Sequence, residues 1–115
     1  MDVAFVGHIP VYLPASDVVC LAWNYEDILR TLHKHRCVLA YLAGHTHNSA
    51  YSQDEKAIHH VVFPGVIEAP PKRSAAHATI LLYPNCVVIK AAKGSGLSDI
   101  RMDITNTTSG TCCLS

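Results

Sequence analysis

Three histidines lie just after two short apolar runs of the sequence. A glycine separates each run from the first histidine that follows it. His8 follows the run Val3–Val6, whereas His45 and His47 follow Cys37–Ala43. Neutral imidazole is the commonest metal ligand in proteins. In α/β enzymes, ligands bind at the carboxyl ends of buried strands. These positions make His8, His45 and His47 candidate metal ligands.

The spacing of the three histidines predicts one shared cavity. In an extended segment, residues two apart point to the same side, so His45 and His47 would face one hollow about 6–7 Å apart. Two metal ions about 3.5–4 Å apart could each take one of them, and His8 would add a third nitrogen. The glycine before each motif is expected to let the backbone turn without a Cβ clash. Oxygen ligands would come from acidic side chains, for which the sequence offers only weak candidates. These are Asp17, Asp54, Glu55 and Glu68.

The segment between the two apolar runs decides whether the histidines meet. Ile28, Leu29 and Leu32 recur with the period of a helix, which we expect over Trp23–His35 with Asn24 as N-cap. Two buried strands joined by a helix form a parallel, right-handed crossover. Both glycine–histidine turns would then lie at the same edge of one sheet.

The second half of the chain is expected to be β-rich. Strands are predicted over Ile58–Phe63, Val66–Glu68, Ala78–Tyr83 and Cys86–Ala91. The last two strands, joined by a Pro-Asn turn, form a hairpin of β-branched residues. Residues 94–115 are rich in Gly, Ser and Thr and are predicted to form a flexible tail, which leaves 1–93 as the folded unit.

Composition excludes several classes of partner. The chain has 115 residues, 50% of them hydrophobic, and its nine basic side chains balance its nine acidic ones. Without a basic stripe, nucleic acid is not expected as a partner. No apolar run approaches the roughly 18 residues of a membrane span. The first residues lack the basic region of a secretory signal, so a cytoplasmic location is expected.

The five cysteines are scattered, odd in number and form no C-x-x-C pair. We interpret them as reduced thiols of a cytosolic protein. The sequence ends Cys-Cys-Leu-Ser, which matches a prenylation box at Cys112. No polybasic segment precedes it, and one prenyl chain alone anchors weakly. A frayed tail is the favoured interpretation, with prenyl anchoring at Cys112 as the alternative.

Five ordered stretches together resemble one enzyme family. They are Gly7–Tyr12, Cys20–Tyr25, Ala43–His47, Gly65–Glu68 and Leu82–Asn85. Glycine–histidine after one strand and G-H-x-H after the next resemble the calcineurin-like metallophosphoesterase superfamily. The whole set is most similar to the C-terminal part of the manganese-dependent ADP-ribose/CDP-alcohol diphosphatase family, and it covers residue 2 to about residue 104.

This resemblance implies a fold and a site. The fold would be α/β, the C-terminal half of a four-layer α/β/β/α sandwich, with each half supplying one sheet. His8 and His45 would ligate one metal ion and His47 the other. The pair of divalent cations would be Mn²⁺, with Mg²⁺, Zn²⁺ or iron as alternatives. Candidate residues lining the substrate pocket are Cys20, Trp23 and Asn24.

The resemblance also implies a reaction. Members of the family hydrolyse a phosphoanhydride, converting ADP-ribose to AMP and ribose 5-phosphate, and CDP-alcohols to CMP and a phosphoalcohol. The family motifs D-x-H, G-D-x-x-D and G-N-H-D/E are not found in these 115 residues. The chain therefore resembles the second half of a split site. An isolated half would expose an apolar sheet face and would self-associate.

Two alternatives stay open. The chain could be a catalytically incompetent fragment that binds metal or nucleotide weakly or docks on a full-length relative. It could also be a structural histidine cluster with a prenylated tail. His59 and His60, adjacent on a strand, face opposite sides, so at most one reaches the site. They are interpreted as structural or surface residues, and His33 and His35 as exposed helix-end residues.

Overall fold

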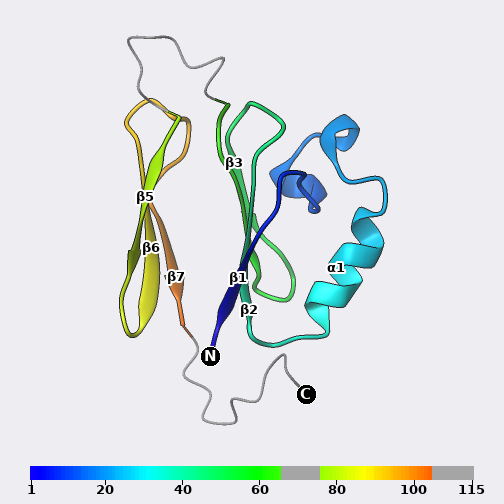
Figure 1. The fold of residues 1–115 in the computed structure, drawn as a ribbon, viewed down its shortest axis with the longest axis horizontal. Coiled ribbons are helices and arrows are strands. Elements are labelled where there is room, and N and C mark those ends of the chain that lie inside the picture. Colours follow the sequence, from blue (N-terminus) through cyan, green and yellow to red (C-terminus); the bar gives the residue numbers. More distant parts are fainter. Residues whose placement is uncertain (66–75, 105–115) are drawn as a thin grey trace.

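The computed structural model describes residues 1–65 and 76–104 (Figure 1). Within them, one α-helix and seven strands form three layers. One sheet lies between the helix on one side and the second sheet on the other. The elements are β1 (Val3–Val6), α1 (Tyr25–His33), β2 (Val38–Ala43), β3 (Ala50–Gln53), β4 (His59–Val62), β5 (Ala78–Leu82), β6 (Cys86–Ala91) and β7 (Ile100–Asp103), with single 3₁₀ turns at Leu13–Ala15 and Val18–Cys20.

The first sheet has the strand order β1-β2-β4-β3. Its first three strands are parallel, and β3 runs antiparallel to β4. The predicted crossover from β1 through α1 to β2 is confirmed, and β2 is central and mostly buried. Because parallel strands end at one edge, the segments after β1 and β2 meet there. The strand β3 was not predicted, because the sequence Ala-Tyr-Ser-Gln carries only a weak alternating pattern.

Helix α1 packs its apolar stripe on the first sheet. It begins after Asn24, as predicted, although the Asn24 side chain makes no capping hydrogen bond. Leu32 is buried against Val38 and Ile58, with Ile28 and Leu29 at the rim of the same cluster. The helix ends at His33, two residues earlier than expected.

The second sheet has the order β5-β6-β7 and is antiparallel. The predicted hairpin of β5 and β6 is confirmed, whereas the prediction of a flexible tail from residue 94 is wrong over 100–103. These residues form β7, in which Ile100 and Met102 are buried and Arg101 and Asp103 are exposed. This alternation is the signature of a half-buried strand, and the Gly/Ser-rich composition around it obscured the signal.

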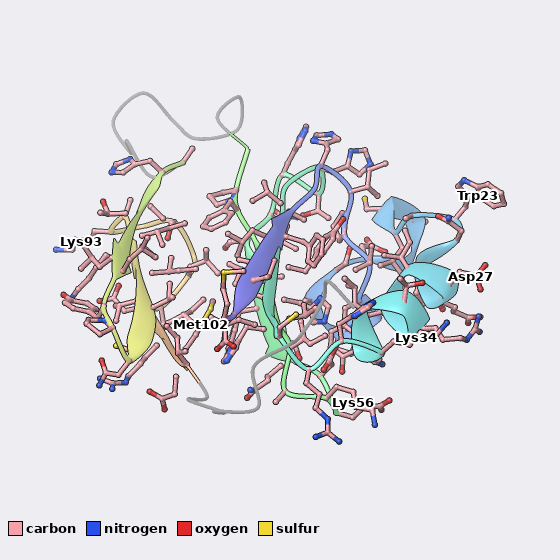
Figure 2. The ribbon with its side chains drawn as sticks, turned by 60° about the horizontal axis from the view of Figure 1, so that its bottom comes forward. Trp23, Asp27, Lys34, Lys56, Lys93 and Met102 are labelled. Atoms are coloured by element: carbon pink, nitrogen blue, oxygen red, sulfur yellow. The ribbon has the colours of Figure 1, made fainter. Side chains whose placement is uncertain are left out.

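The main core lies between the two sheets. Its buried members are Ala40, Leu42, Val61, Ile89, Ile100 and Met102. Figure 2 shows Met102 reaching from the second sheet toward the first. An α/β sandwich is therefore confirmed, but the expectation that each half of the domain supplies one sheet is wrong. This chain contributes strands to both sheets and packs them face to face.

Strand β1 differs from its predicted burial. It is an edge strand, and 81% of the Val6 surface and 44% of the Phe5 surface are exposed. The apolar run was interpreted as buried because strands of parallel sheets are normally covered on both faces. Among residues 1–65 and 76–104, β1 has a neighbouring strand on one side only, which is β2.

The remaining predictions concern cysteines and membranes. Cys20 and Cys86 are free thiols, as expected, but Cys37 is disulfide-bonded, so the expectation that all five cysteines are reduced is wrong. The predicted strand Val66–Glu68 and the prenylation candidate Cys112 lie outside the described residues. In the described part of the chain, no helix is both long and apolar enough to span a bilayer.

Candidate metal centre

His8 and His45 meet at the edge where β1 and β2 end. The Nε2 atom of His8 lies 3.2 Å from the Nδ1 atom of His45. Their ring centroids are 5.0 Å apart, with the planes inclined at 70°, and both side chains are exposed. The sequence prediction that these two glycine–histidine motifs converge is confirmed.

The distance between these nitrogens fits ligation of one ion. Metal–imidazole bonds of about 2.1 Å at octahedral or tetrahedral angles place two ligand nitrogens about 3.0–3.4 Å apart. The observed 3.2 Å falls within this range. Without metal, the same contact is a hydrogen bond, in which one nitrogen carries a proton and the other accepts it. An ion bound by both nitrogens would displace that proton.

The backbone of the second motif is strained. His45 has a φ of 70° and His47 a φ of 64°, in the left-handed region that favours glycine. The segment from His45 to His47 is therefore not extended. The expectation that the alternation of an extended strand orients the two side chains is wrong. Strain of this kind clusters at functional sites. The turn was attributed to the glycine, but the histidines themselves adopt the left-handed conformation.

Gly7 is required for a different reason than the predicted turn. A Cβ atom at Gly7 would lie 2.2 Å from the hydroxyl of Tyr41. That hydroxyl donates a hydrogen bond to the carbonyl of Ile9, with an O···O distance of 3.0 Å. Tyr41 on β2 thus holds the backbone on both sides of His8, and only glycine leaves room for its ring.

Backbone hydrogen bonds fasten the histidine turn to neighbouring strands. The Gly44 amide donates to the His8 carbonyl at 3.1 Å, joining the two motifs directly. The Gly65 amide donates to the His47 carbonyl at 3.1 Å, beyond the end of β4. Further along, the Ser49 hydroxyl donates to the carbonyl of Ser95 and ties the turn to the second sheet. The imidazoles of the pair therefore sit on a fixed frame.

A complete metal site is not assembled by the described residues. Within 1–65 and 76–104, no three His, Cys, Asp or Glu side chains are grouped to hold one ion. His8 and His45 thus form a pair that His47 does not extend to three ligands. The acidic candidates among the described residues, Asp17, Asp54 and Glu55, do not add to it. Asp17 accepts from the Val19 amide, Asp54 is buried elsewhere, and Glu68 lies outside the described residues.

The three candidate substrate-binding residues lie in the loop that follows His8. Trp23 is 95% exposed and projects away from the body of the protein (Figure 2). Trp23 therefore takes no part in the core of the described residues. Asn24 is exposed, and Cys20 is half-buried. The two cavities described in the structure are lined by other residues.

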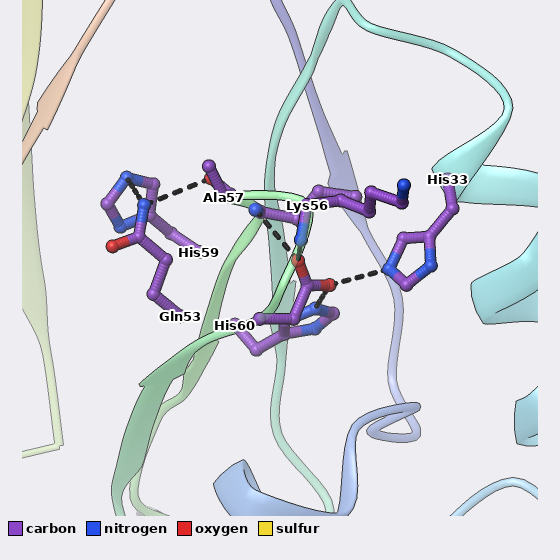
Figure 3. A network of polar contacts seen from close by, with 8 residues as sticks. His33, Gln53, Lys56, Ala57, His59 and His60 are labelled. Carbon is purple, nitrogen blue, oxygen red and sulfur yellow. Dashed lines mark hydrogen bonds and ion pairs between the residues drawn. The ribbon is translucent and has the colours of Figure 1, made fainter.

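Sequence reasoning missed a buried network below the site (Figure 3). The carboxylate of Asp54 accepts hydrogen bonds from His33 Nε2 at 2.9 Å and His60 Nε2 at 2.8 Å. Its other oxygen accepts from the amides of Lys56 and Ile58. His33 was expected to be exposed, but the β3–β4 turn carries Asp54 to it. Only this tertiary contact, which has no local signal, reveals the role of His33.

The two adjacent histidines of β4 are buried and structural, and they face opposite sides as predicted. His60 stacks on Tyr12 with a centroid distance of 4.6 Å, whereas His59 Nδ1 lies 2.7 Å from the hydroxyl of Tyr51. Burial lowers the pKa of both histidines, and it does so despite the raising effect of the Asp54 carboxylate. Neither side chain joins the His8–His45 pair.

Asp54 stays charged in this network. Burial by itself raises its pKa, but the hydrogen bonds from His33, His60 and the Ile58 amide outweigh burial and hold the pKa below its ordinary value. The charged carboxylate accepts a hydrogen bond from each of the two imidazoles. Among the described residues, the second ring nitrogen of His60, Nδ1, is buried without a hydrogen-bond partner.

Comparisons with known proteins find a similar solved structure and several relatives of this chain. No protein-family model matches the chain. A dimetal phosphatase from Danio rerio has a similar structure, with a TM-score of 0.84 and 36% identity over 90% of this chain and 32% of its own. The manganese-dependent ADP-ribose/CDP-alcohol diphosphatase of Homo sapiens is 47% identical over 76% of this chain. That of Xenopus tropicalis is 45% identical over 87% of it.

The two packed sheets with paired imidazoles at the ends of parallel strands define part of a calcineurin-like metallophosphoesterase fold. More particularly, the chain is homologous to part of the manganese-dependent ADP-ribose/CDP-alcohol diphosphatases. It spans about a quarter of the length of these curated relatives, 25% of the human protein and 28% of the frog protein.

Proposed function

We propose that this chain carries part of the dimetal centre of a nucleotide diphosphate hydrolase. His8 and His45 share one divalent cation, and His47 ligates the second. The observation that carries this proposal is the 3.2 Å separation of His8 Nε2 and His45 Nδ1, which suits two ligands of one ion. Mn²⁺ is the expected metal, since the relatives are named manganese-dependent.

The substrates we propose are ADP-ribose and CDP-alcohols, which the names of the relatives print. When bound, a pair of cations would neutralise charge on the diphosphate and would lower the pKa of a bound water molecule toward neutrality. The protein supplies the imidazoles of His8 and His45, fixed by the frame of Gly44 and Tyr41, at an exposed sheet edge. Two or three imidazoles are too few for this chemistry, because hydrolytic dimetal sites also use oxygen ligands. Activity of this chain alone is therefore expected to be absent.

Metal titration of the protein tests this proposal without an activity assay. Paramagnetic Mn²⁺ broadens the NMR resonances of the imidazoles that bind it. We expect His8 and His45 to broaden at the lowest Mn²⁺ concentration, and His45→Ala to remove this effect. The control is His35→Ala, which changes an exposed histidine after α1. Equal broadening of every exposed histidine would refute the site.

A second candidate function is non-catalytic. The chain would dock on a full-length relative or associate with itself and alter the relative's activity. The exposed apolar side chains of β1 favour such contacts. Mixing this chain with the intact Danio rerio phosphatase separates this alternative from the metal-centre proposal. If the chain acts by docking, it changes the hydrolysis rate of the phosphatase even when His8 and His45 bind no metal.

A further inference from the structure

The loop after His8 is held by two tyrosines that both lie next to His60 of β4. The Tyr41 hydroxyl, from β2, donates to the carbonyl of Ile9 at 3.0 Å. Tyr12 belongs to the loop itself, and its ring stacks on His60 with centroids 4.6 Å apart and planes inclined at 28°. The ring centroids of Tyr41 and His60 are 6.3 Å apart. His60 therefore lies beside both side chains that fix the backbone after His8.

The loop does not pack closely on the sheet around this point. A small cavity separates them, and it is lined by Pro10, Val11 and Tyr12 of the loop and by Tyr41 and His60 of the sheet. Val11 is only 1% exposed and belongs to the apolar cluster beneath α1, so it anchors the backbone. Where packing is incomplete, the contacts that remain decide how firmly a segment is held. The stack of Tyr12 on His60 is one of these contacts.

The His60 ring is fixed from its opposite edge (Figure 3). Its Nε2 atom donates to Asp54 at 2.8 Å, and the side chain is 3% exposed. The amides of Lys56 and Ile58 donate to the same carboxylate, which also accepts from His33 at the end of α1. The plane of the ring, and with it the face offered to the loop, is therefore set by groups that lie away from the metal pair.

The second ring nitrogen of His60 indicates what the ring is for. Among the residues that the structure describes, Nδ1 of His60 is buried without a hydrogen-bond partner. Such atoms are rare in native proteins, because burying a polar atom without a partner is unfavourable. A side chain that only donated to Asp54 would not need a ring with an unpaired nitrogen. A side chain that also offers a flat face to Tyr12 does need a ring.

We infer that His60 is a positioning residue of the metal centre: through Tyr12 and Tyr41 it holds the backbone after His8, and it thereby fixes His8 against His45. The hold on the loop rests on the contacts described above, whereas its consequence for metal binding rests on the proposed function. Loss of the stack should loosen the loop without unfolding the chain, because the buried Val11 anchor remains.

Amide hydrogen exchange tests the hold on the loop without metal. Two loop amides report on it. The Gly44 amide donates to the His8 carbonyl at 3.1 Å, and the Ala22 amide donates to the Pro10 carbonyl at 3.0 Å. His60→Gln keeps an N–H donor for the buried carboxylate but removes the ring. Relative to the amides of β6, we expect both loop amides to exchange about three- to tenfold faster, the loss expected for one stacked pair of rings.

The matched control is His59→Gln, at the neighbouring position of the same strand. His59 is 8% exposed against 3% for His60, and it contacts Tyr51 and Gln53 instead of the loop. This variant should leave the exchange of the two loop amides, relative to β6, as in the parent chain. Equal changes in the two variants, or no change in His60→Gln, would overturn the inference, since His60 would then act only on the stability of the sheet.

A second pair of variants decides the question if His60→Gln does not fold. Tyr12→Phe keeps the stacked ring and should keep the protection of the parent chain. Tyr12→Leu keeps an apolar side chain but loses the stack, and it should speed exchange of the two loop amides by about three- to tenfold. The same exchange rates in Tyr12→Leu and Tyr12→Phe would contradict the inference.

Mn²⁺ titration then separates this inference from the proposed function. We expect His60→Gln to weaken Mn²⁺ binding at His8 and His45 by about three- to tenfold, and His59→Gln to leave it unchanged. Faster exchange of the loop amides in a chain that binds no Mn²⁺ at these histidines supports the hold on the loop and refutes the metal centre. Mn²⁺ binding and amide exchange that are both unchanged in His60→Gln support the metal centre and refute the positioning role.

Discussion

His60 on β4 donates from Nε2 to the buried Asp54 carboxylate at 2.8 Å, and the same oxygen accepts from His33 at the end of α1. The side chains of Asp54 and His60 are 1% and 3% exposed. One carboxylate thus joins the helix layer, the β3–β4 turn and the first sheet beneath the metal centre. Because the network is charged and buried, the stability of the fold depends on its protonation state.

Acidification should destabilise the protein in two stages. The pKa values of His59 and His60 are lowered in the folded state, so the unfolded state binds more protons as the pH falls through about 6.5. The pKa of Asp54 is also lowered, which adds a second loss as the pH falls through about 4. Urea unfolding at a series of pH values checks this prediction. The free energy of unfolding should be level above about pH 7.5 and should fall in these two ranges as the pH is lowered.

Replacing the carboxylate should remove the lower stage. Asp54→Asn loses the charge that holds His33 and His60, and we expect the free energy of unfolding at neutral pH to fall by about 2–4 kcal/mol. Asp99→Asn is the control, since Asp99 forms a solvent-exposed ion pair with Lys90 and should cost about 0.5 kcal/mol or less. Equal losses in the two variants would show that the network does not stabilise the fold.

The close contact of Gly7 and Tyr41 makes a second prediction. Gly7→Ala places a methyl group against the Tyr41 ring and should lower the free energy of unfolding by about 1–3 kcal/mol. Tyr41→Phe removes the nearest atom, so the double variant should lose less than the sum of the two single losses. A double-mutant cycle measured by urea unfolding checks this coupling. If the losses in free energy of unfolding were strictly additive, Gly7 and the Tyr41 hydroxyl would not be in contact as the structure has them.

The parts that the sequence predicts well are those with local periodicity. The apolar runs at β1 and β2, the helical stripe of Ile28, Leu29 and Leu32, and the hairpin of β5 and β6 all form as expected. Convergence of His8 and His45 follows from this, because the topology of a parallel crossover places both turns at one edge.

The parts that the sequence does not predict depend on tertiary contacts. No local pattern shows that Asp54 reaches His33, or that Cys37 is disulfide-bonded. The left-handed backbone at His45 and His47 also has no signal, since residues other than glycine seldom adopt it. Burial of β1 was overestimated because an apolar run does not tell how many neighbours a strand has.

Strand β7 supports a third prediction, about the core between the sheets. Met102 is 1% exposed and packs among Val61, Ile89 and Ile100. Met102→Ala should lower the free energy of unfolding by about 2–5 kcal/mol. Leu82→Ala, which removes an exposed side chain of β5, should cost about 0.5 kcal/mol or less in the isolated chain. If Met102→Ala were equally harmless, residues 100–103 would not be part of the core.

Trp23 makes a fourth prediction, because it is the only tryptophan of the chain. With 95% of its surface exposed, its fluorescence should be quenched by acrylamide as readily as that of a free tryptophan derivative. The described residues do not assemble a complete metal site, so ADP-ribose with Mn²⁺ should leave this quenching unchanged in the isolated chain. Protection of Trp23 from acrylamide under these conditions would show that the loop after His8 holds the nucleotide without a complete metal site.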